Sequence, residues 1–392
     1  MTIKQNIPIE VRATRAQPLG MDPADFLRDY WQKRPLLIRA AEQDFVCPLT
    51  PDDLAGLACI EGTLGRIVRY ERRRDRWLVE TGPFAEQRFA SLPKRDWTLL
   101  VQDVDRWDPD VRKLLYPFAF LPRWRIDDIM ISYAVPGGSV GAHVDQYDVF
   151  LLQGMGRRRW QIDASANPPL AFRDDAPICL LREFTASHDW LLGPGDMLYL
   201  PPGVPHFGVA EDACLTLSIG MRAPSAGELL AAFAAQNALD IAESKRYADP
   251  DLSITQAPGE VDSAAVQRVR ASLNAALALD DVAMADWFGR FLSTYRAAEQ
   301  PTPKRISAAQ VESRLKRGSA LTVSPNVRLN YSRDSESALL HGNGESLPIT
   351  LDLAKRCTEF EVLIDAQHYD ALSETERASV VEMCKRGWLV EA

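Results

Sequence analysis

The sequence of 392 residues predicts an α+β protein in which a barrel or sandwich of short strands precedes a helical region and a small mixed domain. From about Arg125 to Met221, short apolar runs alternate with turns that contain Gly and Pro, a pattern typical of sandwiches and barrels. After Pro224 the sequence is rich in Ala and carries apolar residues at helical spacing. Beyond residue 301, strand and helix patterns are mixed.

The first elements precede the barrel. Asp22 followed by Pro23 and an acidic turn predicts the start of a helix, which Pro35 ends, and Leu36 to Ile38 follow as a short buried strand. We expect the barrel strands at residues 128–133, 148–152, 158–162, 197–200 and 214–219, with turns at 135–138 and 153–156.

The helical region has two apolar faces. One helix is predicted from Ser263 as N-cap, with Val266, Val269, Leu273, Ala276 and Leu277 on one side. A second carries Met284, Trp287, Phe288, Phe291 and Tyr295. Faces this apolar need a partner, and a second copy of the chain and the barrel itself are equal candidates.

The last region begins after a predicted linker at residues 301–304. Capping boxes at Ser307 and Ser373 flank strand patterns at 321–329 and 338–349, with a turn around Asn343. Helices around a small sheet resemble a winged helix. This region holds 12 Lys and Arg against 13 Asp and Glu, so it lacks the basic surface of a DNA reader.

Composition limits the partners and the compartment. The net charge of -9 argues against direct nucleic-acid binding and favours a basic protein partner. The six cysteines show no CxxC spacing, as expected for reduced, structural thiols. Without a signal peptide, or an apolar run near the roughly 20 residues that span a bilayer, we expect a soluble cytoplasmic protein with no membrane partner.

The candidate metal ligands are His143, Asp145 and His206. His143 and Asp145 are two residues apart, so on an extended strand both side chains face the same way. His206, after a turn, a strand and a Pro-rich bend, could join them from a facing strand. Two imidazoles and one carboxylate are typical of non-haem Fe(II) sites, although Zn or Mn enzymes also use such sets. His188 is assigned to a loop without chemistry.

Arg158 narrows the choice of metal. An Fe(II) ion held by three side chains can chelate 2-oxoglutarate, whose far carboxylate then needs a buried cation, and a guanidinium matches a carboxylate with two hydrogen bonds. Strand alternation places Arg158 on the face of Trp160, and Arg157 and Arg159 on the opposite face, where we expect a solvated edge.

These residues resemble the Jumonji-C oxygenases, in which HxD is followed by a G-x-K-x-W strand and a distal histidine. Here Arg158 stands in place of the lysine, within GRRRW, and this departure resembles the bacterial ribosomal oxygenases, which hydroxylate an arginine of the L-sixteen protein of the large ribosomal subunit. The similarity runs through FLRDYWQKRPLLI, WRIDDIMISY, VPGGSVGAHVDQYDVFLLQGMGRRRW, residues 193–206 and SIGMRAP, and weakens afterwards.

The resemblance implies a double-stranded β-helix, the jelly-roll or cupin barrel of Jumonji-C proteins. It would occupy about residues 95–223 of an oxygenase domain at 1–223. A helical dimerisation domain at 224–300 and a winged-helix-like domain at 301–392 would follow, giving a homodimer.

The resemblance also implies the chemistry. Fe(II), with O2 and 2-oxoglutarate as co-substrates, would hydroxylate the β carbon of a protein arginine (3-hydroxylation) and release succinate and carbon dioxide. His143, Asp145 and His206 would be the metal ligands. Arg158 would anchor 2-oxoglutarate, and Ser132 would share that anchor.

A substrate pocket is indicated on the strand before the metal ligands. Asp128, Met130 and Ser132 alternate and so face one interior, where a carboxylate and a thioether suit an arginine, and Tyr147 could cover the arginine stem. The resemblance adds Ser218 as a fourth substrate contact. The alternative for Asp128 is an ion pair with Arg125.

Three other functions stay open at this stage. A Jumonji-C oxygenase could act on histidine or methyl-lysine, and a barrel metalloenzyme could use Zn or Mn. A ligand-sensing barrel joined to a winged helix could act as a regulator without catalysis, although the charge balance of the C-terminal region weighs against it.

Overall fold

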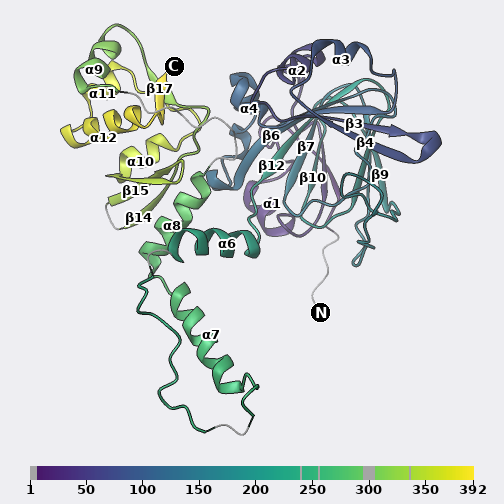
Figure 1. Cartoon of the computed structure of the whole chain (residues 1–392). Coiled ribbons are helices and arrows are strands. Elements are labelled where there is room, and N and C mark those ends of the chain that lie inside the picture. The colour runs from purple at the N-terminus through teal and green to yellow at the C-terminus, as the bar shows by residue number, and fades with distance from the viewer. Residues whose placement is uncertain (1–6, 239–240, 255–256, 295–304, 335–336) are drawn as a thin grey trace, which may run out of the picture. The chain divides into compact units, whose positions relative to one another are not determined.

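The computed structural model describes residues 7–238, 241–254, 257–294, 305–334 and 337–392 (Figure 1). These divide into two compact units, with the boundary between Ala223 and Pro224.

The first unit is a β-sandwich with a large and a small sheet. The nine strands of the large sheet follow the order β1-β2-β10-β7-β12-β6-β5-β3-β4, and the small sheet has the order β11-β8-β9. All pairs are antiparallel except β1 with β2. The strands are β1 (Glu10–Arg12), β2 (Leu36–Arg39), β3 (Gly65–Glu71), β4 (Arg76–Thr81), β5 (Trp97–Val101), β6 (Ile126–Ala134), β7 (Val149–Met155), β8 (Arg158–Ile162), β9 (His188–Leu192), β10 (Met197–Leu200), β11 (His206–Ala210) and β12 (Cys214–Met221).

Short helices cover the ends and edges of this sandwich. They are α1 (Pro23–Asp29), α2 (Pro51–Leu57), α3 (Glu86–Ala90), α4 (Val104–Trp107) and α5 (Pro109–Lys113), with single 3-10 turns at Arg72–Arg74, Tyr116–Phe118 and Arg123–Arg125. Asp22 caps α1 by accepting a hydrogen bond from the Ala24 N–H, as the sequence predicted.

One part of the core lies between the two sheets. Leu151 of β7 and Leu198 of β10 pack in one apolar cluster with Trp160 and Ile162 of β8. Alternation along β8 explains this cluster, because Arg158, Trp160 and Ile162 are buried while Arg159 and Gln161 are partly exposed. The same alternation carries the Arg158 guanidinium into the sandwich.

Most of the predicted strands are found, and one predicted turn is wrong. β8 and β10 have the predicted bounds, and β2, β6, β7 and β12 contain or overlap the predicted runs. Gln153 to Met155, however, continue β7, because their backbone pairs with β12. The turn is made at Gly156, whose φ of 62° favours glycine.

The second unit begins with three helices, α6 (Ala226–Asn237), α7 (Ser263–Leu277) and α8 (Asp281–Ser293). The N-cap of α7 is Asp262, which accepts from the Ala265 N–H, so the assignment of Ser263 as N-cap is wrong by one residue. Tyr295 and the predicted linker at 301–304 lie outside the described residues.

A small α/β core completes the second unit. Its elements are α9 (Ala308–Lys316), β13 (Leu321–Val323), β14 (Asn330–Asp334), β15 (Ser337–Gly342), β16 (Glu345–Thr350), α10 (Leu351–Cys357), α11 (Ala366–Asp370), α12 (Glu374–Lys385) and β17 (Leu389–Glu391). Leu315, Leu340, Val380 and Trp388 lie in its buried cluster. Gly289 of α8 accepts a hydrogen bond from Asn330 of β14, so α8 packs on this sheet.

One strand prediction in this region is wrong, and the predicted turn around Asn343 is confirmed. The run 321–329 stops as a strand at Val323, and β14, further along the chain, was not predicted. The run 338–349 is a hairpin of β15 and β16 that turns at Asn343 and Gly344, both with positive φ.

No described helix is long and apolar enough to cross a membrane. The six cysteines are free thiols, and Cys214, Cys357 and Cys384 are buried. Burial raises the pKa of the Cys357 thiol to about 12, so this residue packs as a small apolar group.

Candidate active site

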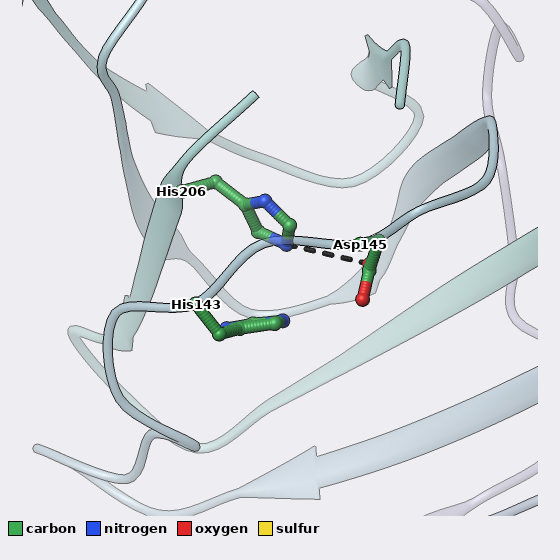
Figure 2. A group of neighbouring side chains, drawn as sticks. All are labelled: His143, Asp145 and His206. Carbon is green, nitrogen blue, oxygen red and sulfur yellow. Dashed lines mark ion pairs between the residues drawn. The ribbon is translucent and has the colours of Figure 1, made fainter. Parts of the chain in front are cut away.

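His143, Asp145 and His206 lie together inside the sandwich (Figure 2). Their ligand atoms are all within 4.8 Å of one another, and the His206 Nε2 lies 3.6 Å from Asp145 Oδ2. The two imidazole rings have centroids 4.2 Å apart. One metal ion could therefore contact all three side chains.

The backbone holds the two histidines in register. The His143 N–H donates to the His206 carbonyl at 3.0 Å, and the His206 N–H donates to the His143 carbonyl at 2.9 Å. His206 opens β11, in agreement with the predicted facing strand. The expected strand through His143 and Asp145 is wrong, since His143 forms only an isolated bridge with His206, and Asp145 lies in a loop, where its carbonyl accepts from the Gly203 N–H.

Hydrogen bonds fix the orientation of both imidazoles. The Nδ1 atoms of His143 and His206 lie 3.0 Å from the carbonyl oxygens of Gly141 and Val204. A carbonyl only accepts, so Nδ1 carries the proton and the Nε2 lone pair is left for a metal. Burial, and then the neighbouring His143, lower the pKa of His206 to about 4, which keeps its imidazole in the neutral, metal-binding form.

Arg158 is 3 % exposed and lies in the same interior. Its Nη1 donates to Ser132 Oγ at 3.1 Å and to Thr216 Oγ1 at 3.2 Å, and the guanidinium lies 5.4 Å from the Trp160 ring centre. In the described part of the chain no carboxylate forms an ion pair with it, and its buried Nε has no hydrogen-bond partner. Burial lowers the pKa of Arg158, so an anionic ligand would relieve an unfavourable charge.

Thr216 and Gln153 extend this polar group, and the sequence reasoning missed both. Thr216 Oγ1 donates to Gln153 Oε1 at 3.1 Å, and both side chains are fully buried. Thr216 pairs with Ser132 across β12 and β6, and alternation on β12 puts it on the face of Ser218. That alternation identifies Thr216, whereas the sequence pattern predicts a turn at Gln153.

Arg157 and Arg159 lie on the surface, as the alternation predicted. Arg157 pairs with Asp212 at 2.9 Å, and Arg159 pairs with Asp189 and Glu211 at 2.8 and 2.7 Å. His188 belongs to β9 rather than to the expected loop. It stacks on Trp190 and lies outside the metal-ligand group.

Asp128, Met130 and Ser132 share one face of β6, opposite Ser218 and Thr216 of β12. Asp128 Oδ2 accepts a hydrogen bond from the Asp103 N–H at 3.0 Å. Burial, and then the charges of Asp103 and Asp127, raise the pKa of Asp128 to about 7.

The alternative partner for Asp128 is wrong. Arg125 pairs instead with the fully buried Asp148 at 3.0 Å. Met130 packs against a cluster that contains Val68 and Trp77, and Ser218 is 9 % exposed. Tyr147 is 42 % exposed, two residues after Asp145.

Family models match three parts of the chain. A JmjC domain matches residues 113–229, a range that contains His143, Asp145, His206 and Arg158. A ROXA-like winged helix matches 275–363, from the end of α7 to past α10. An AraC-like ligand binding domain matches 184–277, a stretch that contains His206 but neither His143, Asp145 nor Arg158.

One relative and one solved structure match nearly the whole chain, and a second relative matches about three fifths of it. "Ribosomal protein uL16 3-hydroxylase" of Escherichia coli is 34% identical over 91% of this chain and 94% of its own length. "Probable ribosomal oxygenase" of Haemophilus influenzae is 40% identical over 61% of this chain and 57% of its own. The X-ray structure of E. coli YcfD matches with a TM-score of 0.82 at 32% identity, covering 95% of this chain and 98% of that one.

A JmjC β-sandwich that encloses two histidines, an aspartate and a buried arginine defines a protein of the Jumonji-C oxygenase class. A structure of YcfD in complex with cobalt and 2-oxoglutarate matches over the same 95% of this chain with a TM-score of 0.80. With 34% identity over 91% of its own length and 94% of the relative's, the chain belongs to the ribosomal oxygenase family.

Proposed function

We propose that this protein is an Fe(II)- and 2-oxoglutarate-dependent hydroxylase that 3-hydroxylates an arginine of the ribosomal protein uL16, in the cytoplasm. The observation that carries the proposal is the buried Arg158, which lacks a carboxylate partner in the described chain and shares an interior with His143, Asp145 and His206. A dicarboxylate that chelates the metal at one end would place its second carboxylate on this guanidinium.

Each part of the site has a distinct task. Bound Fe(II) would supply the redox chemistry that couples decarboxylation of 2-oxoglutarate by O2 to hydroxylation of the substrate. His143, Asp145 and His206 would hold the metal on one side and leave the other side open. Arg158, with Ser132 and Thr216 beside it, would bind and orient 2-oxoglutarate.

The arginine pocket would be formed by Asp128, Met130, Tyr147 and Ser218. Asp128 is a mostly buried carboxylate on the β6 face that Ser132 shares, so one strand would carry the guanidinium contact and part of the 2-oxoglutarate anchor. A carboxylate selects a guanidinium through charge-assisted, bidentate hydrogen bonds. A neutral histidine ring or a trimethylated lysine offers no such pair of donors, and this difference favours arginine.

The test is turnover with a defined substrate. The protein, loaded anaerobically with Fe(II) and then given O2, 2-oxoglutarate and an arginine-containing uL16 peptide, should form succinate and add about 16 Da to one arginine. Asp145→Ala should abolish both products, whereas Asp189→Ala, which removes a surface partner of Arg159, should keep them. Succinate formation with no oxygen on any arginine would reject the substrate, and the absence of both products would reject the oxygenase assignment.

We also propose that residues 224–300 form a dimerisation region ahead of the winged-helix-like end at 301–392. Helix α7 has no buried residue, and its apolar stripe is open to solvent. The stripe consists of Val266, Val269, Leu273 and Leu277, which are 42 to 61 % exposed. Exposed apolar stripes of this kind mark association surfaces.

The mass in solution tests the dimer. Light scattering should give twice the chain mass of 43.8 kDa for the wild type. Leu273→Glu should give the single-chain mass, because a charge would be buried in the interface. Ala275→Glu places the same charge on the opposite face of α7 and should stay dimeric. A monomeric wild type would reject the proposal.

A further inference from the structure

Strand β6, which carries Asp128, pairs with β5 only over its later residues, so Asp128 lies beyond the end of that pairing. β5 pairs with β6 only as far as Val101 opposite Ile131. Nearer the start of β6, Asp105 Oδ1 accepts from the Ile129 N–H at 2.9 Å. Side-chain and backbone groups of residues 103–105 therefore replace β5 along this edge of β6.

Asp103 makes the contact with the pocket. Its N–H donates to Asp128 Oδ2 at 3.0 Å. Asp103 has φ 54° and ψ 33°, the left-handed conformation that few residues other than Gly, Asn and Asp adopt readily. The direction of this N–H depends on φ of Asp103 and on ψ of the residue before it, so a change from the left-handed φ would turn the N–H away from Asp128 unless the preceding torsion compensated.

The segment that bears Asp103 is firmly held. Val104 is fully buried and Asp105 is 9 % exposed. Arg112 donates through Nε to the Asp105 carbonyl at 2.8 Å and through Nη2 to the Arg106 carbonyl at 3.2 Å. The donor is thus fixed before any substrate arrives.

The other oxygen of Asp128 is left for a ligand. Within the described residues, Oδ1 has no hydrogen-bond partner. It faces Gly220 of β12, where an added Cβ would lie 3.4 Å away, so no side chain of β12 covers it at this position. One carboxylate oxygen accepts a hydrogen bond from the protein, while the second has no protein donor among the described residues.

We infer that Asp103 is a positioning residue for the substrate arginine. Its left-handed backbone aims an N–H at Asp128 Oδ2, which orients the carboxylate so that Oδ1 receives the guanidinium. This inference rests on the proposed function, in which Asp128 contacts the arginine. Pre-orienting a binding group strengthens the complex because less freedom is lost on binding.

Substitutions at position 103 separate the backbone from the side chain. Gly and Asn both tolerate the left-handed conformation, and both remove the carboxylate charge. Val also removes the charge, and in addition it disfavours the left-handed conformation, because a β-branched residue is strongly disfavoured at positive φ. Asp103→Val should therefore misdirect the N–H, and Asp103→Gly and Asp103→Asn should keep it.

The measurement is steady-state hydroxylation of a uL16 peptide by the full-length, Fe(II)-loaded enzyme. Asp103→Val should raise the peptide KM by about tenfold, because the variant loses one well-oriented hydrogen bond to Asp128. The KM for 2-oxoglutarate should stay at the wild-type value, since Arg158 is untouched. Asp103→Gly and Asp103→Asn should keep the peptide KM within about threefold of the wild-type value.

A control variant separates the effect of backbone strain at a left-handed aspartate from the effect of the place of Asp103 in the fold. Asp44 also has a left-handed conformation, with φ 55°, and its side chain is 87% exposed. Asp44→Val should leave the peptide KM unchanged. If Asp103→Val proves too unstable to assay, Asp103→Ala imposes a milder penalty at positive φ and should raise the peptide KM by a smaller factor than Val.

The outcomes distinguish the inference from the function on which it rests. A wild-type peptide KM in Asp103→Val or Asp103→Ala, together with a raised KM in Asp128→Asn, would overturn the role of Asp103 and keep the pocket. A wild-type peptide KM in Asp128→Asn would overturn the pocket itself. Equal increases in Asp103→Gly and Asp103→Val would show that the carboxylate of Asp103, rather than its backbone, matters.

Discussion

Replacement of Arg158 by Met should move stability and ligand affinity in opposite directions. Arg158 is buried, carries no carboxylate partner in the described chain, and has a pKa that burial lowers. Met has a similar length without the charge. The unliganded enzyme should gain from losing a desolvated charge, and the complex with 2-oxoglutarate should lose its anchor.

The magnitudes follow from the contacts. Loss of the hydrogen bonds to Ser132 and Thr216 should cost about 1–2 kcal/mol. Replacing a buried charge by an apolar group of similar size gains about 1–4 kcal/mol, so the net change in the unfolding free energy of the unliganded variant lies between a loss of about 1 kcal/mol and a gain of about 3 kcal/mol, a gain over most of that range. Breaking the charge-assisted pair with a carboxylate should cost roughly 3 kcal/mol, or about a hundredfold in the Kd for 2-oxoglutarate.

Thermal or chemical unfolding with and without 2-oxoglutarate measures both effects. At a ligand concentration about 100 times the wild-type Kd, 2-oxoglutarate should stabilise the wild type by about 2.7 kcal/mol, and the variant by only about 0.4 kcal/mol. Arg159→Met changes an exposed arginine of the same strand and should keep the full ligand effect. A variant with reduced stability and an unchanged ligand effect would refute the reasoning.

Three further results are expected. Asp148→Asn should destabilise the protein by about 3–5 kcal/mol in urea unfolding, because it leaves the Arg125 charge, 3.0 Å away, without its buried partner; a loss below 1 kcal/mol would contradict this. Folding raises the pKa of Asp128 from 3.8 to about 7, so its contribution to stability is full below pH 4 and is lost as the pH rises to 7. Asp128→Asn should remove this dependence and gain at most about 4 kcal/mol above pH 7, measured as unfolding free energy against pH; identical profiles would disprove it. Mn(II), as a stand-in for Fe(II), should raise the Tm of the wild type but not of His206→Ala, and an equal rise in both would place the metal elsewhere.

The fold of the first unit was largely predictable because its strands alternate and end at Gly or Pro. β8 shows this most clearly, since alternation alone separated the buried Arg158 from the surface Arg157 and Arg159. The spacing of His143 and Asp145 also indicated a shared site, although the backbone there is a loop rather than a strand. Residues two apart in an extended segment point to the same side whether the segment is a strand or a loop, so both side chains can bind one metal ion.

Features that depend on distant pairing were not predictable. The turn expected at Gln153 is strand, because β12 supplies hydrogen bonds from more than 60 positions along the chain. The sequence predicts only that Asp148 begins a strand, because its burial with Arg125 arises from elements that meet only in three dimensions. The role of the Asp103 N–H depends on a positive φ that no local pattern indicates, since Asp occurs at many helix starts without it.

Departures from ordinary folding rules coincide with the proposed chemistry. A buried guanidinium without a carboxylate, a carboxyl group with a pKa near neutrality and a left-handed aspartate each lower stability when taken alone. All three border the face shared by β6 and β12. A dicarboxylate would neutralise the first and a guanidinium the second, so two ligands of opposite charge would remove the unfavourable terms together. We therefore expect the site to bind an anionic co-substrate and a cationic substrate side by side. This would explain why a single change at Arg158 should stabilise the empty protein and impair the working enzyme.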